Sequence, residues 1–234
     1  METKIFYSNE QLTRYFGDCL MELQNQKDRP LNVALAGGST PEQIFDTLTQ
    51  EYRNTLNWDN LHFFWGDERC VPPDHEESNY KMARKHLFDH LPIPEENIFR
   101  IRGELNPEEA RQNYESILQN KLPHANGLPY FDAIMLGMGD DGHTASIFPY
   151  EISLWNSDNL CEIGTHPQSG QKRITLTGKV INNAENIMFL VTGEKKAAKV
   201  DEIINQKNGY KNNPAALTDP HKTIWLLDQK AAGR

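Results

Sequence analysis

The segment from Gly137 to His143, Gly-Met-Gly-Asp-Asp-Gly-His, carries the sharpest chemical signal in this sequence. Three glycines in seven residues imply special backbone angles. His143 is suited to act as a general base, because an imidazole changes charge near neutral pH. Asp141, two residues earlier, is placed to orient that ring. Asp140 is also explained as the cap of a glycine-rich turn, and it remains the alternative partner of the histidine.

A second cluster consists of Gly37, Gly38, Ser39 and Thr40, which follow an apolar run and precede Pro41. Glycines let the backbone approach a ligand closely, and N–H groups at a helix start suit a phosphate together with two hydroxyls. The spacing matches neither common nucleotide-binding glycine motif, so no nucleotide is implied. An ordinary strand-to-helix turn with a capping hydroxyl would have the same composition.

Two acids and a guanidinium stand together at Asp67, Glu68 and Arg69, after another apolar run. Arginine can clamp a phosphate or stabilise an oxyanion. The triplet alone is more typical of a surface salt-bridge cluster.

Further cations stand at Arg173, Lys195 and Lys196. A lysine at the start of a predicted helix opposes the helix macrodipole, and an anionic ligand would remove that penalty. We therefore expect one of the two lysines to bind an anion and the other to be a solvated surface residue.

Short apolar runs alternate with longer amphipathic segments along the chain. The apolar runs predict strands at residues 4–7, 31–36, 61–65, 131–136, 173–176, 187–191 and 223–227. Helical spacing predicts helices at residues 9–26, 78–88, 107–122 and 192–204. Two further helices are predicted to begin at Pro41 and at Thr144.

Nearly continuous apolar strands between helices indicate an α/β fold, with an open, mostly parallel sheet and helices on both faces. Such sheets bind ligands beyond the carboxyl ends of their strands. The polar clusters after residues 36, 65, 136 and 191 all fall there.

The chain has 234 residues and a net charge of −9. This length fits one domain over residues 1–234. The acidic balance argues against a nucleic-acid or anionic-membrane partner, and no apolar run could span a bilayer. The N-terminus lacks the features of a signal peptide. Three cysteines without metal spacing fit a reducing, cytoplasmic setting.

His86 and His90 are four residues apart on a predicted helix, but no glutamate follows His86, so the zinc-protease motif is missing. The chain also lacks the Gly-x-Ser-x-Gly elbow of many serine hydrolases. We expect no metal and no cofactor.

Together these clusters resemble the 6-phosphogluconolactonase family. The matching segments follow the family's order and span essentially the whole chain: residues 35–41, 64–72, 78–79, 137–149, 173–177, 192–197 and 225–228. The 137–149 segment is the most specific, and only the polar region 205–214 departs, as a variable loop. The resemblance implies an open α/β sheet, no cofactor and a 6-phosphorylated δ-lactone as the small-molecule substrate. We expect a monomer or a weak homo-oligomer.

Glucosamine-6-phosphate deaminases share this fold and are the main alternative. They carry Asn-Glu-Pro after their histidine loop, where this chain has Ile147, Phe148 and Pro149, and a tyrosine where it has Arg69. Both differences favour the lactonase. A sugar-phosphate-binding protein without catalysis is a third hypothesis.

The resemblance and the residues together predict how the site works. His143 would activate water, and Arg69 or backbone N–H groups of the glycine loop would hold the oxyanion. Gly139 would contact the substrate. Asp67 and Glu68 would position Arg69 and the substrate hydroxyls. The phosphate would lie against the residues Gly37, Gly38, Ser39, Thr40, Arg173 and Lys196. Lys196 is preferred over Lys195 because it takes the family's lysine position before Ala197.

Overall fold

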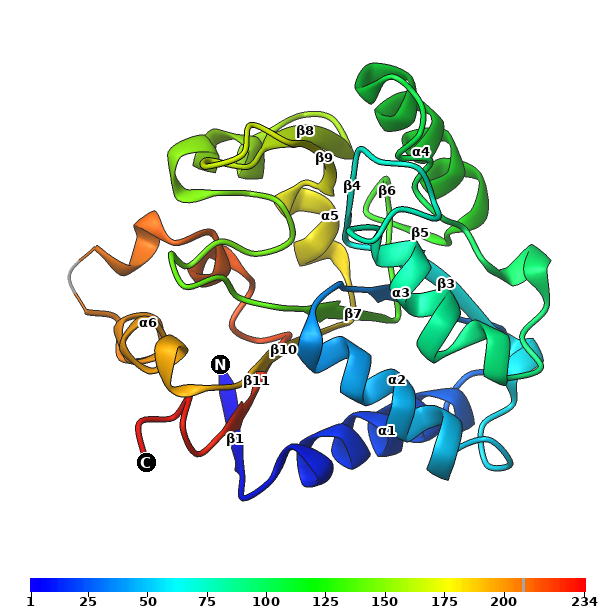
Figure 1. Ribbon diagram of the computed structural model, residues 1–234, viewed down its shortest axis with the longest axis horizontal. Coiled ribbons are helices and arrows are strands. Elements are labelled where there is room, and N and C mark those ends of the chain that lie inside the picture. The colour runs from blue at the N-terminus through cyan, green and yellow to red at the C-terminus, as the bar shows by residue number, and fades with distance from the viewer. Residues whose placement is uncertain (208) are drawn as a thin grey trace.

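A six-stranded parallel sheet forms the centre of the computed structural model, which describes residues 1–207 and 209–234 (Figure 1). Residue 208, in the predicted variable loop, lies outside the described residues. The strand order is β1-β11-β10-β7-β2-β3, and every neighbouring pair is parallel. The strands are β1 (Glu2–Phe6), β2 (Leu31–Leu35), β3 (Leu61–Trp65), β7 (Ala133–Leu136), β10 (Asn186–Val191) and β11 (Thr223–Asp228).

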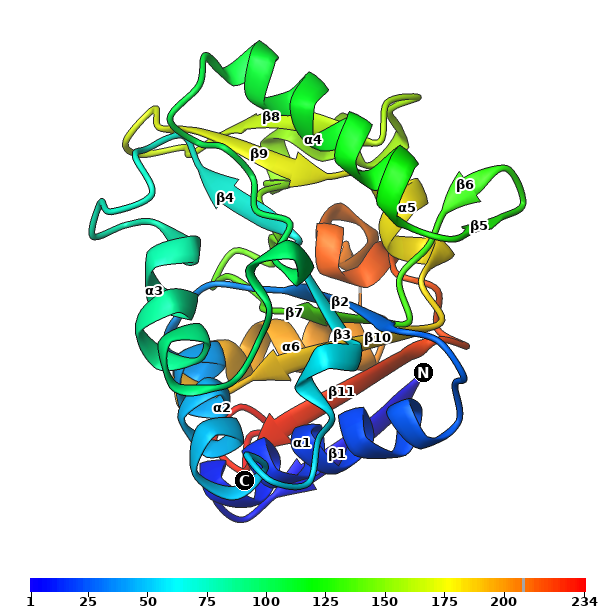
Figure 2. The same cartoon turned by 90° about the vertical axis from the view of Figure 1, so that its right-hand side faces the viewer.

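Helices cover both faces of this sheet, as the sequence predicts. Figures 1 and 2 show α1 (Asn9–Asn25) and α2 (Ser39–Glu51) on one face and α6 (Ala197–Ile204) on the other. The remaining α-helices are α3 (Asn79–His86), α4 (Pro107–Lys121) and α5 (Gly178–Asn183). Short 3₁₀ helices are η1 (Trp58–Asn60), η2 (Phe88–His90), η3 (Glu95–Asn97), η4 (Pro149–Asn156), η5 (Glu194–Lys196), η6 (Tyr210–Asn212) and η7 (Pro214–Leu217).

A second, antiparallel sheet lies beside the first and is covered by α4 (Figure 2). Its order is β4-β9-β8, from β4 (Asp67–Arg69), β9 (Lys172–Leu176) and β8 (Cys161–Thr165). The apolar pattern predicted the strand at residues 173–176, whereas Asp67 to Arg69 were predicted to be polar residues beyond a strand end. They form a strand because β9 supplies hydrogen-bonding partners, pairing Asp67 with Thr175 and Arg69 with Arg173. A small hairpin joins β5 (His124–Ala125) to β6 (Leu128–Pro129).

One predicted helix is absent and another begins later than predicted. No helix starts at Thr144, because Ala145 has a left-handed φ of +48° and Thr144 bridges to Ile147. The predicted helix over residues 192–204 begins instead with the 3₁₀ turn η5, and α6 starts only at Ala197. Gly193 precedes that turn with a φ of +94°, a conformation that favours glycine.

The core explains why the polar clusters meet. Strands β2, β3, β7 and β10 carry almost only buried residues. Because these strands are parallel and in register, their carboxyl ends lie along one edge of the sheet. The glycine-containing loops that follow them therefore share that edge.

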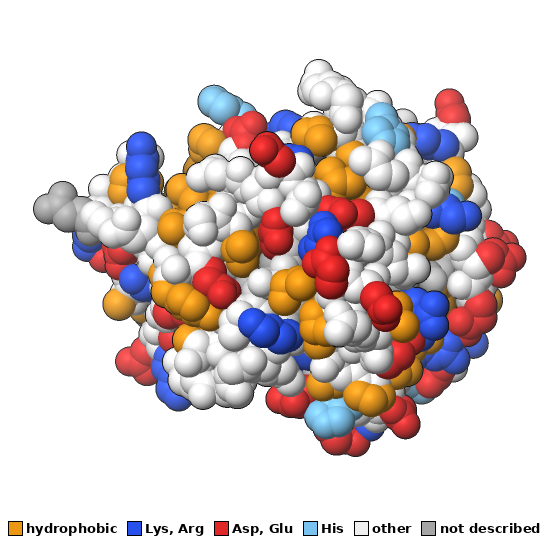
Figure 3. All heavy atoms as spheres, turned by 90° about the horizontal axis from the view of Figure 1, so that it is seen from above, with side chains coloured by type: hydrophobic (Ala, Val, Ile, Leu, Met, Phe, Trp, Pro, Cys, Tyr) orange, Lys and Arg blue, Asp and Glu red, His pale blue; other side chains and the backbone are white. Residues whose placement is uncertain are grey.

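Two predictions concern a membrane and nucleic acid, the partners that the sequence argues against. No helix in residues 1–207 and 209–234 combines the length and the apolar character that a membrane span needs. Figure 3 shows acidic and basic side chains interspersed on one face of the molecule, so this face is not a continuous basic surface.

Candidate active site

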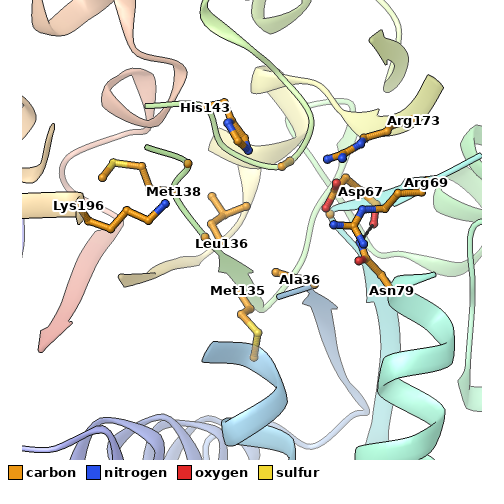
Figure 4. Close-up of a pocket in the computed structure, with 15 residues that line it drawn as sticks. Ala36, Asp67, Arg69, Asn79, Met135, Leu136, Met138, His143, Arg173 and Lys196 are labelled. Atoms are coloured by element: carbon orange, nitrogen blue, oxygen red, sulfur yellow. Dashed lines mark hydrogen bonds between the residues drawn. The ribbon is translucent and has the colours of Figure 1, made fainter. Parts of the chain in front are cut away.

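A cleft of about 260 Å³ opens at the carboxyl edge of the main sheet, below the small sheet (Figure 4). Its walls come from the loops after β2, β3, β7 and β10, from strands β4 and β9 and from the start of α3. Seven of the residues predicted for the site line it: Gly37, Asp67, Arg69, Gly139, His143, Arg173 and Lys196.

His143 and Asp141 form a hydrogen-bonded pair. Nδ1 of His143 lies 2.6 Å from Oδ1 of Asp141, and the same oxygen accepts the backbone N–H of His143 at 3.1 Å. Burial raises the pKa of Asp141, but the hydrogen bond and charge of His143 outweigh it and hold that pKa at about 2. With Nδ1 engaged, Nε2 is the imidazole nitrogen left for a ligand. Asp140 contacts Lys196 instead, so Asp141 is the partner of the histidine.

The glycine loop is folded tightly around the imidazole. A Cβ on Gly139 would lie 2.1 Å from the His143 ring, so only glycine fits there. The N–H of Gly139 donates to the His143 carbonyl at 2.9 Å, and the N–H of Gly142 donates to the Gly139 carbonyl at 3.0 Å. These two N–H groups are therefore engaged within the loop, and the predicted contact of Gly139 with the substrate stays a prediction.

Arg69 and Arg173 stand side by side as a register pair on β4 and β9. The Nε atoms of both are buried and have no hydrogen-bond partner among the residues described. Arg69 donates from Nη1 to the Glu77 carbonyl at 2.5 Å. Burial, followed by the charge of Arg69, lowers the pKa of Arg173, while Asp67 opposes this shift. Two adjacent guanidinium groups with unused donors are suited to bind an anion.

Asp67 lies between these arginines and the glycine loop (Figure 4). Its Oδ2 accepts from the Ser146 hydroxyl at 2.6 Å, and its backbone carbonyl accepts from Nδ2 of Asn79 at 2.9 Å. The side chain is buried yet lines the cleft. It is therefore held by the protein while facing any ligand.

Glu68, predicted to take part in the chemistry, points away from the cleft and is 2% exposed. Its carboxylate accepts from the Ser78 hydroxyl and from the N–H groups of Arg69, Asn79 and Tyr80. Burial raises its pKa, and these backbone N–H groups act against the rise. Glu68 thus caps helix α3 and anchors the Arg69 backbone, and its predicted contact with substrate hydroxyls stays a prediction.

The predicted phosphate loop contributes only Gly37 to the cleft lining. A Cβ at Gly37 would lie 1.9 Å from Oδ1 of Asn79, which explains the glycine. Gly38 and Ser39 are exposed, and the Thr40 hydroxyl lies 2.8 Å from the Thr192 hydroxyl. These three residues do not line the cleft itself, and their contact with the phosphate stays a prediction.

Lys196 enters the cleft from the side opposite Arg69 and Arg173 (Figure 4). Its Nζ lies 2.5 Å from Oδ1 of Asp140. Lys195 is exposed to solvent, as expected for the second lysine. The cleft thus has cations on both sides and the histidine between them.

Residues 8–225 match the family described as glucosamine-6-phosphate isomerases/6-phosphogluconolactonase. The chain belongs to this family. A 6-phosphogluconolactonase of Treponema pallidum is 51% identical over 203 residues, covering 85% of this chain and 79% of the relative.

Solved structures agree with this membership. The three-dimensional structure of 6-phosphogluconolactonase from Trypanosoma brucei superposes with a TM-score of 0.86 at 29% identity, covering 99% of this chain and 97% of that one. A monomeric glucosamine-6-phosphate deaminase has a TM-score of 0.79 at 19% identity, covering 100% and 99% of the two chains. The latter likeness shows the shared fold alone.

Two further residues of this family member stand at the site without having been predicted as functional. Phe148 is 1% exposed, and its ring centroid lies 4.6 Å from that of His143 and 5.8 Å from Cζ of Arg173. His166 meets the same phenyl ring edge-on at 5.6 Å. In the sequence, Phe148 was noted only because it stands where the deaminases have an acid. His166 gave no signal, because the β8–β9 hairpin that places it beside the cleft is a tertiary feature.

Proposed function

We propose that this chain hydrolyses 6-phospho-D-glucono-1,5-lactone to 6-phosphogluconate, a step of the oxidative pentose phosphate pathway. The observation that carries the proposal is the His143–Asp141 pair set in a cleft with cations on both sides, in a chain 51% identical to a protein named 6-phosphogluconolactonase. We propose a cytoplasmic setting for the reaction, and the free thiols of Cys19, Cys70 and Cys161 support it. Residues 1–234 act as one domain, since the two sheets share one hydrophobic core cluster.

His143 acts as the general base. Its Nε2 takes a proton from water as the water oxygen attacks C1 of the lactone, and Asp141 holds the ring through Nδ1. The tetrahedral intermediate then collapses, the bond from C1 to the ring oxygen breaks, and the imidazolium returns its proton to that oxygen. The carboxylic acid formed loses its own proton to solvent.

Arg69 stabilises the oxyanion. It is favoured over the glycine loop because the N–H groups of Gly139 and Gly142 already donate within that loop. One well-placed donor contributes about 3–4 kcal/mol to such a transition state. Asp67, held by Ser146, is positioned to accept hydrogen bonds from substrate hydroxyls.

Arg173 and Lys196 bind the 6-phosphate from opposite sides of the cleft. Arg173 contributes a guanidinium whose Nε has no hydrogen-bond partner among the described residues. The Lys196 ammonium, which contacts Asp140 in this structure, binds the phosphate in place of that carboxylate. A few local cations suffice for this, so the net charge of −9 does not oppose an anionic substrate.

The deaminase reaction is the second candidate, and Phe148 argues against it. A deaminase of this fold needs an acid at that position to assist ring opening, whereas this chain has a buried phenyl ring beside the histidine. Release of ammonia from glucosamine 6-phosphate would support the deaminase. Tight binding of 6-phosphogluconate with no turnover of the lactone would support a non-catalytic binding protein.

The test follows hydrolysis of freshly made 6-phosphogluconolactone, corrected for spontaneous opening. Wild type should accelerate it, and His143→Ala should lower kcat by about 10²–10⁴-fold. His124→Ala is the matched control, because His124 is an exposed histidine on the small β5–β6 hairpin. A His143→Ala rate within a few-fold of wild type would refute the mechanism.

A further inference from the structure

Asp228, at the carboxyl end of β11, holds the loop that leads to Lys196. Its two carboxylate oxygens each accept the N–H of Gly193 at 3.0 Å, and Oδ1 also accepts the N–H of Ala231 at 2.7 Å. Hydrogen bonds to an ionised acceptor are roughly twice as strong as neutral ones. The carboxylate therefore fixes the direction of the Gly193 peptide.

The direction of that peptide sets the position of the Lys196 backbone, three residues later. Gly193 has a φ of +94°, and its carbonyl accepts the N–H of Lys196 at 3.1 Å, which closes the turn η5. The hydroxyl of Thr192 lies 2.8 Å from that of Thr40, so α2 ties the same loop from the other side. Lys196 itself is the N-cap of α6 and lines the cleft.

We propose that Asp228 is a positioning residue for Lys196. It fixes residues 192–196 so that the lysine side chain enters the cleft, and it thereby sets the affinity for the 6-phosphate. Asp228 does not line the cleft, so it acts only through the loop. A phosphate-binding group must be held within about 0.5 Å of its productive place, and a four-carbon side chain on a loose loop would not be. The inference rests on the proposed function.

The alternative is that Asp228 only stabilises the C-terminal turn through Ala231. The two roles differ in what they change. A general stabilising role would affect all substrates alike and would not depend on Lys196. A positioning role would change KM for phosphorylated substrates and would disappear when Lys196 is absent.

The experiment measures KM and kcat of Asp228→Ala and Asp228→Asn with 6-phosphogluconolactone and with unphosphorylated glucono-1,5-lactone. Asp228→Ala should raise KM for the phosphorylated lactone about tenfold with kcat within about twofold, as expected when binding alone is lost. Asp228→Asn should raise it less, because the amide keeps one oxygen acceptor. KM for the unphosphorylated lactone should not change.

The decisive comparison repeats Asp228→Ala in a Lys196→Ala background. If Asp228 acts through Lys196, the second substitution adds no more than about twofold to KM. The same tenfold increase with or without Lys196 would overturn the proposal, as would equal effects on both lactones. If Asp228→Ala does not fold, Asp228→Asn is used in the same comparison.

Asp219→Asn is the matched control. Asp219 lies before the opposite end of β11, where its Oδ1 accepts the N–H of His221 at 2.9 Å, and its substitution should leave both KM values unchanged. A wild type without lactonase activity would refute the proposed function. An active wild type whose Asp228→Ala variant keeps its KM would refute the positioning role alone.

Discussion

The phenyl ring of Phe148 lies against the imidazole of His143, with centroids 4.6 Å apart and planes inclined by 47°. Phe148 is almost wholly buried, so it forms a fixed wall on one side of the base. The same ring contacts the guanidinium of Arg173. One buried aromatic residue therefore touches both the proposed base and a proposed phosphate ligand.

Phe148→Leu should lower kcat by about tenfold, a barrier increase of about 1.4 kcal/mol, because the imidazole loses its support. The measurement is steady-state hydrolysis of 6-phosphogluconolactone. Phe63→Leu is the matched control, since Phe63 is equally buried and packs edge-on against Phe88 away from the cleft. A kcat loss of the same size in both variants would show that general packing is responsible.

Asp141→Asn should lower kcat by about 10²-fold or more, because an amide holds the imidazole less firmly and offers no charge to the imidazolium. The pH dependence of stability supplies a second readout. The pKa of Asp141 is depressed to about 2, so its stabilising effect is full above its ordinary value near 3.8 and disappears as pH falls through 2. Thermal unfolding of wild type and variant should therefore converge between pH 4 and pH 2. Melting temperatures that remain apart at pH 2 would contradict this.

Arg173→Ala should raise KM for 6-phosphogluconolactone by about 10²-fold, as expected when a desolvated charge-assisted contact to phosphate is lost. Glucono-1,5-lactone, which lacks the phosphate, should be affected far less. Arg102→Ala serves as control, because Arg102 is a half-exposed arginine paired with Glu104. Equal effects of Arg173→Ala on both lactones would remove the phosphate assignment.

Asp132→Asn should destabilise the fold by about 1.5–3 kcal/mol, because the buried carboxylate loses its charge-assisted hydrogen bonds to the partly exposed Arg29. Burial alone would raise the pKa of Asp132, but the Arg29 hydrogen bonds leave it lowered. A depressed pKa means that the stabilisation is present at neutral pH and declines below the ordinary value of 3.8. Urea unfolding at pH 7 and at decreasing pH should show this difference shrinking in acid. A constant difference would contradict the ionic contribution.

The sequence predicted the main sheet well because its strands are short, apolar and buried. Strand β4 was not predictable, since Asp67, Glu68 and Arg69 are polar and become a strand only when β9 pairs with them. The role of Glu68 was hidden for a related reason. Apart from the neighbouring Arg69, its partners begin ten residues later at Ser78, and only the folded loop brings them to the carboxylate.

The site was predictable where chemistry is local. Asp141 and His143 are two residues apart, and their contact requires only the glycine loop. The position of Ser39 and Thr40 relative to the cleft was not predictable, because the orientation of a helix N-terminus depends on its neighbours. Here Thr40 bonds to Thr192, which is 152 residues away in the chain.

The pairing of β4 with β9 has a consequence for synthesis on the ribosome. Arg69 and Arg173 adjoin only after more than 100 further residues have emerged, and such distant pairings form slowly. A nascent chain that ends before β9 already contains Arg69 and His143 but no closed wall around them. We therefore expect ligand binding to appear late in translation, after β9, β10 and the Lys196 loop have left the exit tunnel, so that truncated chains do not compete for substrate.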